Sequence, residues 1–328
     1  MAAINTQSKA SQSSMGWSLL FGLPPYEVVR AFCELLAREL NHRNACGPAA
    51  QALRQYYRRL FLADGTPSPL GVYGYASRLA PVLAALREAK SPVRLLDAGC
   101  GYGTESLLLA LSGADVTGVE LVPERVKLAR SRTSFYQEHT STALSIRFVN
   151  ANVIRYLEKA GPFDIIWIME AVSHIHPLEI LLPLAYERLS PDGLLITSDP
   201  NALNPIALYR AYRIRGAPHY TLRLKGQDPS NGAPVYEAVE RIFSVPGYAR
   251  RLKKAGFRVQ EITVSGFMAA SLVPAPLHKS KVIFTLLTSL QRTLQAFPIL
   301  RQMGVNYTVV AQKAVCGDAS WGQRQAQA

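Results

Sequence analysis

The chain has 328 residues, of which 48% are hydrophobic and 18% charged, and it carries a net charge of +13. This composition supplies enough apolar residues for one large α/β domain with appendages, and it excludes a disordered or fibrous protein. No apolar run reaches the roughly 18 residues of a membrane-spanning helix, and the four cysteines show no metal-like pairing, so we expect reduced thiols in a cytoplasmic protein.

The first 90 residues are predicted to form a disordered end followed by a helical cap. Residues 1–14 are rich in Ser, Gln and Ala, a composition typical of disorder. Within residues 26–62, apolar residues recur every three or four positions, and residues 44–48 interrupt this pattern. We therefore predict that residues 15–90 contain two helices that pack over the cleft of the domain that follows.

A glycine-rich run at residues 95–104, with the sequence LLDAGCGYGT, carries the strongest functional signal. A short buried strand, residues 93–96, ends at Asp97, turns on three alternating glycines and enters an apolar helix. Glycines at this spacing have no Cβ atoms to block the approach of a ligand to the backbone. The next strand, residues 115–119, is followed by Glu120, which is placed to accept hydrogen bonds from ribose hydroxyls.

The spacing of these glycines discriminates between nucleotide ligands. A dinucleotide fingerprint would need a glycine at Thr104 or Ser106, which excludes a nicotinamide oxidoreductase, and the chain has no Gly-Lys-Ser/Thr phosphate loop. Asp97 is a poor neighbour for a pyrophosphate and a good one for an ammonium group. A ligand that joins a cationic amino acid to a ribose, S-adenosylmethionine, matches both Asp97 and Glu120.

The run resembles motif I of the class I S-adenosylmethionine-dependent methyltransferases, and the likeness covers residues 93–263 and a last strand near residues 305–311. The resemblance implies an α/β, Rossmann-like fold: a seven-stranded, mostly parallel sheet with helices on both faces, one antiparallel strand at the edge, an N-terminal helical cap and a substrate-cap insertion. It implies a methyltransferase with S-adenosyl-L-methionine as its cofactor. The implied cofactor-binding residues are Asp97, Gly99, Cys100, Gly101, Gly103, Glu120, Leu121, Asn152, Val153 and Glu170.

One of these positions departs from the family's pattern. Asn152 stands where the family usually has an aspartate. An amide can still form a hydrogen bond with adenine, but it removes a charged acceptor for the exocyclic amine.

Strand and helix alternate through the middle of the chain, a pattern typical of a parallel sheet covered on both faces. Strands are predicted at residues 115–119, 146–149, 163–169, 194–197, 257–264 and 305–311. The predicted organisation is a cofactor-binding core at 91–200, an irregular basic substrate-cap insertion at 201–245, a C-terminal part of the core at 246–315 with an apolar and basic helical insertion at 266–303, and a tail at 316–328.

The fourth strand leads into the candidate catalytic residues. Residues 169–175, MEAVSHI, are similar to the Glu-x-x-Glu-His stretch of the ubiquinone-type O-methyltransferases. Ser173 replaces the second acid, which leaves Glu170 and His174 as too small a ligand set for a divalent cation, so we predict no metal. We predict Glu170 and His174 as catalytic residues, with His174 removing a proton from an attacking hydroxyl. A structural histidine is the alternative, and a carboxylate or carbanion acceptor would need no base.

The insertions give the information on the acceptor. Residues 205–260 contain eleven Lys/Arg and three Asp/Glu, and residues 266–303 contain no acid. A basic amphipathic helix at residues 279–297 suits contact with a membrane surface or a lid over an apolar pocket, and a core helix is the alternative. We therefore expect a small-molecule or lipid-like acceptor and a cytoplasmic enzyme with peripheral membrane contact.

Two other functions stay open at this point. An RNA or protein methyltransferase could use the basic surface, although the fourth strand lacks the Asn/Asp/Ser-Pro-Pro-aromatic run of base amino-methylating enzymes, so nucleic acid is not the expected partner. A binding protein could keep the fold without catalysis, although the intact glycine motif argues for retained cofactor binding. The sequence specifies neither the acceptor atom nor the oligomeric state.

Overall fold

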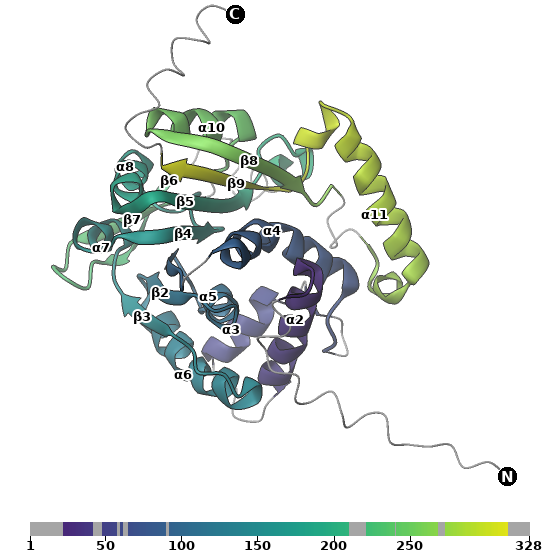
Figure 1. Ribbon diagram of the computed structural model, residues 1–328, viewed down its shortest axis with the longest axis horizontal. Helices are drawn as coiled ribbons and strands as arrows, with labels where there is room; N and C mark the ends of the chain where they lie inside the picture. The colour runs from purple at the N-terminus through teal and green to yellow at the C-terminus, as the bar shows by residue number, and fades with distance from the viewer. Residues whose placement is uncertain are drawn as a thin grey trace, which may run out of the picture.

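A seven-stranded sheet forms the centre of the molecule (Figure 1). The computed structural model describes residues 22–41, 48–57, 60–61, 65–89, 92–209, 221–239, 241–267 and 273–313. The strand order is β3-β2-β1-β4-β5-β9-β8. These strands are β1 Arg94–Ala98, β2 Asp115–Glu120, β3 Ile146–Asn150, β4 Phe163–Met169, β5 Leu189–Pro200, β8 Phe257–Ser265 and β9 Asn306–Lys313.

Helices cover both faces of this sheet, as the sequence predicted. The α-helices with assigned bounds are α2 Pro25–Asn41, α3 Pro48–Tyr57, α4 Pro69–Glu88, α5 Thr104–Leu111, α6 Pro123–Thr140, α7 Val153–Lys159, α8 Leu178–Arg188, α10 Val245–Lys254 and α11 Lys281–Ala296. One core cluster joins the sheet to α2, α4 and α5, and a second joins it to α7, α8 and α10.

The parallel strands supply side chains to both clusters, because successive residues of a strand point to opposite faces. In β1, Leu95 belongs to the first cluster and Leu96 to the second. In β4, Trp167 packs in the first cluster and Ile166 and Ile168 pack in the second. This two-sided burial explains the continuous apolar runs that predicted these strands.

The position of the antiparallel strand differs from the prediction. β9 pairs with β5 on one side and β8 on the other, so it lies inside the sheet, and it runs antiparallel to both. The prediction of one antiparallel strand at the edge is wrong, since the edges are β3 and β8. A strand's own sequence reports its burial and period but not the direction of its neighbours, so this order was not readable from the chain.

The basic insertion is more regular than predicted. Within residues 201–245, β6 (Thr221–Gln227) and β7 (Pro234–Val239) form an antiparallel hairpin, so the prediction of an irregular segment is wrong there. Asp228 closes the turn, since its carboxylate accepts from the N–H of Ser230 at 2.9 Å and from its hydroxyl at 2.6 Å. A two-stranded hairpin buries few side chains, which explains its weak apolar signal.

The N-terminal cap contains α2, which ends at Asn41, α3, which begins at Pro48, and a further helix, α4. Most of the predicted interruption at residues 44–48 lies outside the described residues. Ser68 caps α4 by accepting a hydrogen bond from the N–H of Gly71 at 3.3 Å, and Pro69 occupies the first turn. The predicted disorder of residues 1–14 and the predicted tail at 316–328 lie outside the described residues.

The amphipathic helix predicted at residues 279–297 is α11, and it is not a core helix. Its apolar residues Val282, Leu286 and Leu290 are 67%, 60% and 42% exposed, and the helix lies at one side of the sheet (Figure 1). In the part of the chain that the structure describes, no helix combines the length and apolar character needed to cross a membrane.

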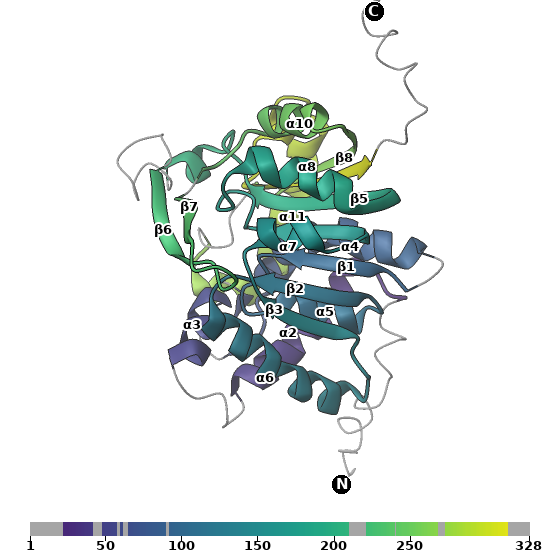
Figure 2. The same ribbon diagram turned by 90° about the vertical axis from the view of Figure 1, so that its left-hand side faces the viewer.

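Two elements project over the carboxyl ends of the parallel strands. Figure 2 shows α3 and the β6–β7 hairpin at the same end of the sheet. The hairpin is joined to the segment after β4, because Ile175 forms a β-bridge with Glu237 and the N–H of Ala238 donates to the carbonyl of His174 at 3.0 Å. This arrangement encloses the region in which ligands of parallel α/β sheets bind.

Candidate active site

A cavity of about 800 Å³ lies at the carboxyl ends of β1, β2 and β4. The loop after β1 lines it through residues 99–102, the segment after β4 lines it through residues 169–171 and 173–176, and α3 and the β6–β7 hairpin contribute further side chains. Its volume is typical of a small-molecule site. The cavity therefore brings the glycine loop and the predicted catalytic segment together.

Gly99 and Gly101 shape the loop that faces this cavity. Their φ angles of +79° and +56° are in the left-handed region, which favours glycine. The N–H groups of Gly99 and Cys100 both donate to the carbonyl of Val119, at 2.8 and 3.0 Å, which fixes the loop to β2. A Cβ added at Gly101 would meet no atom within 4 Å. Because Gly101 lines the cavity, a side chain there would occupy ligand space.

Gly103 and Cys100 serve the packing of the loop. A Cβ at Gly103 would lie 2.7 Å from the ring of Phe148 and 2.9 Å from Ala129, and Gly103 is not a cavity-lining residue. Cys100 lines the cavity but is buried, and burial raises the pKa of its thiol. Its thiol is therefore a packing group and not a nucleophile.

Glu120 ends β2 with its carboxylate at the cavity. One oxygen accepts from the N–H of Gly101 at 3.1 Å, and the other accepts from the N–H of Val122 at 2.9 Å. Arg125 lies 3.8 Å away as an ion-pair partner. Leu121 follows and also lines the cavity. The geometry leaves a charged acceptor at the place where the sequence predicted a ribose contact.

Asp97 lies beneath the loop and not at the cavity surface. It is 2% exposed, and its carboxylate accepts a hydrogen bond from the hydroxyl of Ser106 at 2.5 Å. Burial raises the pKa of Asp97 to about 7. The residue thus joins β1 to the first turn of α5.

Asn152 and Val153 line the cavity at the start of α7. The side-chain oxygen of Asn152 caps this helix by accepting from the N–H groups of Ile154 and Arg155, at 2.9 and 3.4 Å. Capping engages the acceptor atom of the amide, so the NH₂ group is the part that can serve a ligand.

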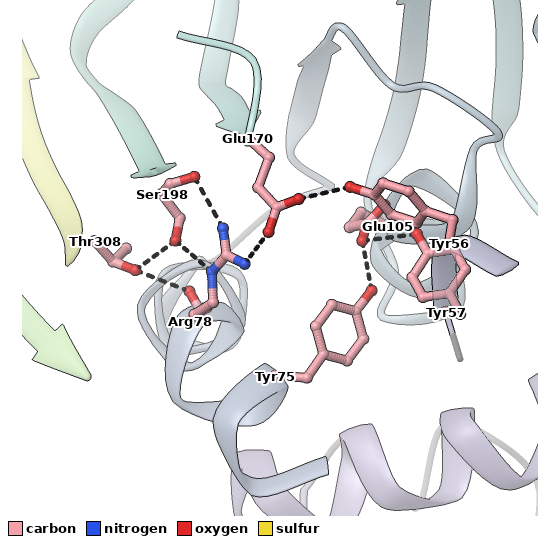
Figure 3. A network of polar contacts seen from close by, with 8 residues as sticks. All are labelled: Tyr56, Tyr57, Tyr75, Arg78, Glu105, Glu170, Ser198 and Thr308. Carbon is pink, nitrogen blue, oxygen red and sulfur yellow. Dashed lines mark hydrogen bonds and ion pairs between the residues drawn. The ribbon is translucent and has the colours of Figure 1, made fainter. Parts of the chain in front are cut away.

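Glu170, the first residue after β4, is held by two partners from the N-terminal cap (Figure 3). Arg78 of α4 forms an ion pair with one carboxylate oxygen, and the hydroxyl of Tyr56 donates to the other at 2.7 Å. The Arg78 side chain is 4% exposed and also donates to the hydroxyl of Ser198 at 3.0 Å. Thr308 of β9 donates to the same hydroxyl at 3.0 Å. The network fixes the position of the Glu170 carboxylate at the cavity.

A second carboxylate, Glu105, lines the cavity from the first turn of α5. The hydroxyl of Tyr75 donates to it at 2.6 Å, and the hydroxyl of Tyr57 lies 3.1 Å from both of its oxygens (Figure 3). Burial and the charge of Glu105 raise the pKa values of both phenols. Both tyrosines therefore remain hydrogen-bond donors.

His174 lines the cavity in one defined tautomer. Its Nδ1 lies 3.1 Å from the carbonyl of Ala238, and a carbonyl only accepts, so Nδ1 carries the proton. The Nε2 atom then presents a lone pair, with no hydrogen-bond partner among the described residues. Burial lowers the pKa of His174, so the imidazole is neutral at physiological pH.

The hairpin brings charged groups to the cavity beside His174. Arg223 and Lys225 of β6 both form ion pairs with Glu237 of β7, and all three residues line the cavity. These two cations compensate Glu237 and lower its pKa against the effect of burial. This part of the cavity keeps a net positive charge.

Other candidates do not form a metal site. His176, the residue after Ile175, also lines the cavity, whereas residues 210–220 of the predicted basic insertion lie outside the described residues. Across the described ranges, no three His, Cys, Asp or Glu side chains gather in a way that could hold a metal ion. The prediction of metal-independent activity stays a prediction.

Sequence reasoning missed residues of the cavity that come from α3, α5 and the hairpin, and one residue of α4 that holds Glu170 from outside the cavity lining. The cavity residues are Tyr56, Tyr57, Glu105, Arg223 and Lys225, and the residue of α4 is Arg78. Glu105 could have been found, since it follows the glycine motif within the first helical turn. Arg78 pairs with a residue 92 positions away and Tyr56 with one 114 positions away, and no local pattern encodes such pairs.

The chain is similar to a known protein family and to several curated proteins. The family described as "Methyltransferase domain" matches residues 73–262, which is more than half of the chain. A protein of Psychrobacter arcticus named ubiquinone biosynthesis O-methyltransferase is 33% identical over 132 residues, covering 40% of this chain and 48% of its own. A protein of the same name from Xanthomonas campestris is 35% identical over 143 residues, covering 42% and 55%. The chain thus spans about half the length of these curated relatives.

Among solved structures, a magnesium protoporphyrin IX methyltransferase from Synechocystis with bound SAH has a TM-score of 0.46 and 13% identity, covering 88% of this chain and 100% of its own. A SAM-dependent methyltransferase from Archaeoglobus fulgidus has a TM-score of 0.46 and 19% identity, covering 80% and 99%.

Proposed function

Because the chain belongs to the methyltransferase-domain family, we propose that it transfers the methyl group of S-adenosylmethionine to an oxygen of a hydrophobic small-molecule or lipid-like acceptor. The observation that carries this proposal is the shared cavity, in which the glycine loop and Glu120 lie with the unprotonated Nε2 atom of His174. The names of the curated relatives, which are O-methyltransferases, support the choice of oxygen.

The residues at the loop fit this cofactor. Gly101 leaves open space where any side chain would intrude, and Glu120 offers a carboxylate for the ribose hydroxyls. The NH₂ group of Asn152 suits an acceptor nitrogen of adenine, with Leu121 and Val153 as apolar neighbours of the base. Asp97 and Gly103 support the loop from below. When bound, S-adenosylmethionine supplies a methyl group on a positively charged sulfur.

His174 is the proposed base of the reaction. Its Nε2 atom accepts the proton of the acceptor hydroxyl as the new oxygen–carbon bond forms and the sulfur–carbon bond breaks. Burial and the charge of Lys225 lower the pKa of His174, whereas the charges of Glu237 and Glu170 raise it and so favour the imidazolium that results. Glu170 is thus proposed to act through its charge, because Arg78 and Tyr56 already engage its oxygens.

Label transfer tests the choice of oxygen. The protein is incubated with methyl-labelled S-adenosylmethionine and a dodecyl-substituted catechol, and the organic phase is treated with alkali. A methyl ether survives this treatment, whereas a methyl ester is hydrolysed. Label in an alkali-stable product that depends on His174 supports the proposal. Label that enters only RNA, protein or an amine, with none in the catechol or a bacterial lipid extract, contradicts it.

Peripheral membrane contact is the proposed route by which the acceptor arrives. Helix α11 exposes Val282, Leu286 and Leu290 within residues 266–303, a stretch with four Lys/Arg and no acid. An apolar ridge beside positive charge fits an anionic bilayer. Co-sedimentation with vesicles should rise with the fraction of anionic lipid and should fall in Leu286→Glu. A wild-type protein that ignores anionic vesicles at low salt would instead favour a water-soluble acceptor.

A further inference from the structure

Four glutamates line the cavity, and Glu105 differs from the other three in its partners. The other three are each paired with cations: Glu120 with Arg125, Glu170 with Arg78, and Glu237 with Arg223 and Lys225. Within the described ranges, no Lys, Arg or His lies within ion-pair distance of Glu105. Its partners are the hydroxyls of Tyr57 and Tyr75.

This environment leaves Glu105 with both charge and acceptor capacity. An ionised carboxylate has about four acceptor sites, and the two phenols donate one proton each. The phenols carry no positive charge, so among the described residues no ion pair compensates the charge of Glu105, which is half-buried. A partly buried carboxylate of this kind favours a cationic ligand over a neutral one.

The glycine loop places this carboxylate beside the cofactor. Glu105 is the second residue of α5, directly after the glycine loop, and it lines the same cavity as Gly101. The acid that the sequence predicted for this contact, Asp97, is fully buried beneath the loop with Ser106 as its partner and does not line the cavity. Of the two acids, Glu105 is the one that a bound molecule can reach.

We propose that Glu105, positioned by Tyr57 and Tyr75, binds the α-ammonium group of the methionine portion of the cofactor. The inference rests on the proposed function, because it takes S-adenosylmethionine as the ligand. An ammonium group supplies a positive charge and additional N–H donors, which the hydroxyls of Tyr57 and Tyr75 do not provide to the Glu105 carboxylate. Glu105 is therefore a residue that selects for the amino-acid end of the ligand.

The test compares two probes by calorimetry: S-adenosylhomocysteine and its analogue in which hydrogen replaces the α-ammonium group. The wild type should prefer S-adenosylhomocysteine. In Glu105→Gln, which keeps the side chain's size and loses its charge, the affinity for S-adenosylhomocysteine should fall about 10- to 100-fold, as expected for a hydrogen bond between charged groups. The affinity for the analogue should stay the same, so the preference should disappear.

Asp97→Asn is the matched control, and it should keep the preference for S-adenosylhomocysteine. A preference lost in Asp97→Asn and kept in Glu105→Gln would overturn the inference and return the contact to Asp97. If Glu105→Gln does not fold, Glu105→Asp carries the test, and an unchanged preference there also overturns the inference. Wild-type protein that binds neither probe would refute the proposed function itself, which separates the two failures.

Discussion

Replacing Arg78 with methionine tests whether the buried network at Glu170 orders the active site. The substitution keeps much of the side chain's volume and removes a charge whose side chain is 4% exposed. It also removes the hydrogen bonds to the hydroxyl and carbonyl of Ser198, at 3.0 and 3.2 Å. Glu170 then loses the ion pair with Arg78.

Breaking one side of a buried ion pair destabilises a protein by about 3–5 kcal/mol. The Glu170 side chain is 21% exposed and keeps the hydroxyl of Tyr56, so we expect the lower end, about 3 kcal/mol. If the free energy of unfolding falls by about 3 kcal/mol per molar urea, the midpoint of unfolding should fall by about 1 M urea. The fluorescence-detected midpoint of Arg78→Met in urea measures this effect.

Arg94→Met is the matched control. Arg94 pairs with Asp164 at the surface, with side chains 50% and 36% exposed, and losing such a pair costs less than about 1 kcal/mol. Adding Glu170→Gln to Arg78→Met should recover part of the loss, because the side chain that lost the Arg78 ion pair is then neutral. Equal midpoints for Arg78→Met and Arg94→Met, or a further loss in the double variant, would refute the reasoning.

Three further predictions follow from the titratable groups of the site. The value of kcat/KM should be constant above pH 6.5 and should fall at lower pH, because burial lowers the pKa of His174 and only the neutral imidazole is a base. A His174→Ala variant whose residual activity shows the same fall at low pH would contradict the assignment of His174 as the base. Burial raises the folded pKa values of Asp97 and of Asp199, a buried residue near the end of β5 that accepts from the N–H of Ser173, to about 7 from an ordinary 3.8. The folded state of the unliganded protein therefore binds more protons than the unfolded state, and it should lose about 1.5 kcal/mol of stability as the pH rises from 6.5 to 8. In urea titrations, Asp97→Asn should remove about half of this pH dependence, and an unchanged dependence would show that Asp97 does not titrate there. Methyl transfer should survive exhaustive chelation, because Arg78 and Tyr56 engage the Glu170 carboxylate; a loss that magnesium or zinc restores would make Glu170 and His174 metal ligands.

The sequence predicted best what local periodicity and turn chemistry encode. β4 was predicted at residues 163–169 and has those bounds, since its apolar run is buried on both faces. Gly99, Gly101 and Glu120 line the cavity, because the motif sets both the turn and the strand end. That they bind the cofactor stays a prediction. The spacing of apolar residues predicted the amphipathic helix α11, but it did not predict that these apolar residues are exposed.

What the sequence could not supply depends on contacts between distant segments. The place of β9 inside the sheet follows from pairing with two strands, and neither pairing leaves a mark in its own residues. The burial of Asp97 depends on the hydroxyl of Ser106 and on the packing of α5, whereas the motif alone suggested a ligand contact. The tautomer of His174 is set by a carbonyl of the hairpin, an element that was itself predicted as irregular.

The central claim is that the loop at Gly101 binds S-adenosylmethionine, and calorimetry of two glycine variants tests it most directly. Gly101 and Gly113 both have positive φ angles and open space at the Cβ position, but only Gly101 lines the cavity. The wild type should bind the cofactor with micromolar affinity, about −7 to −8 kcal/mol. Binding should be kept in Gly113→Val and abolished in Gly101→Val. A folded Gly101→Val protein with wild-type affinity would contradict the account.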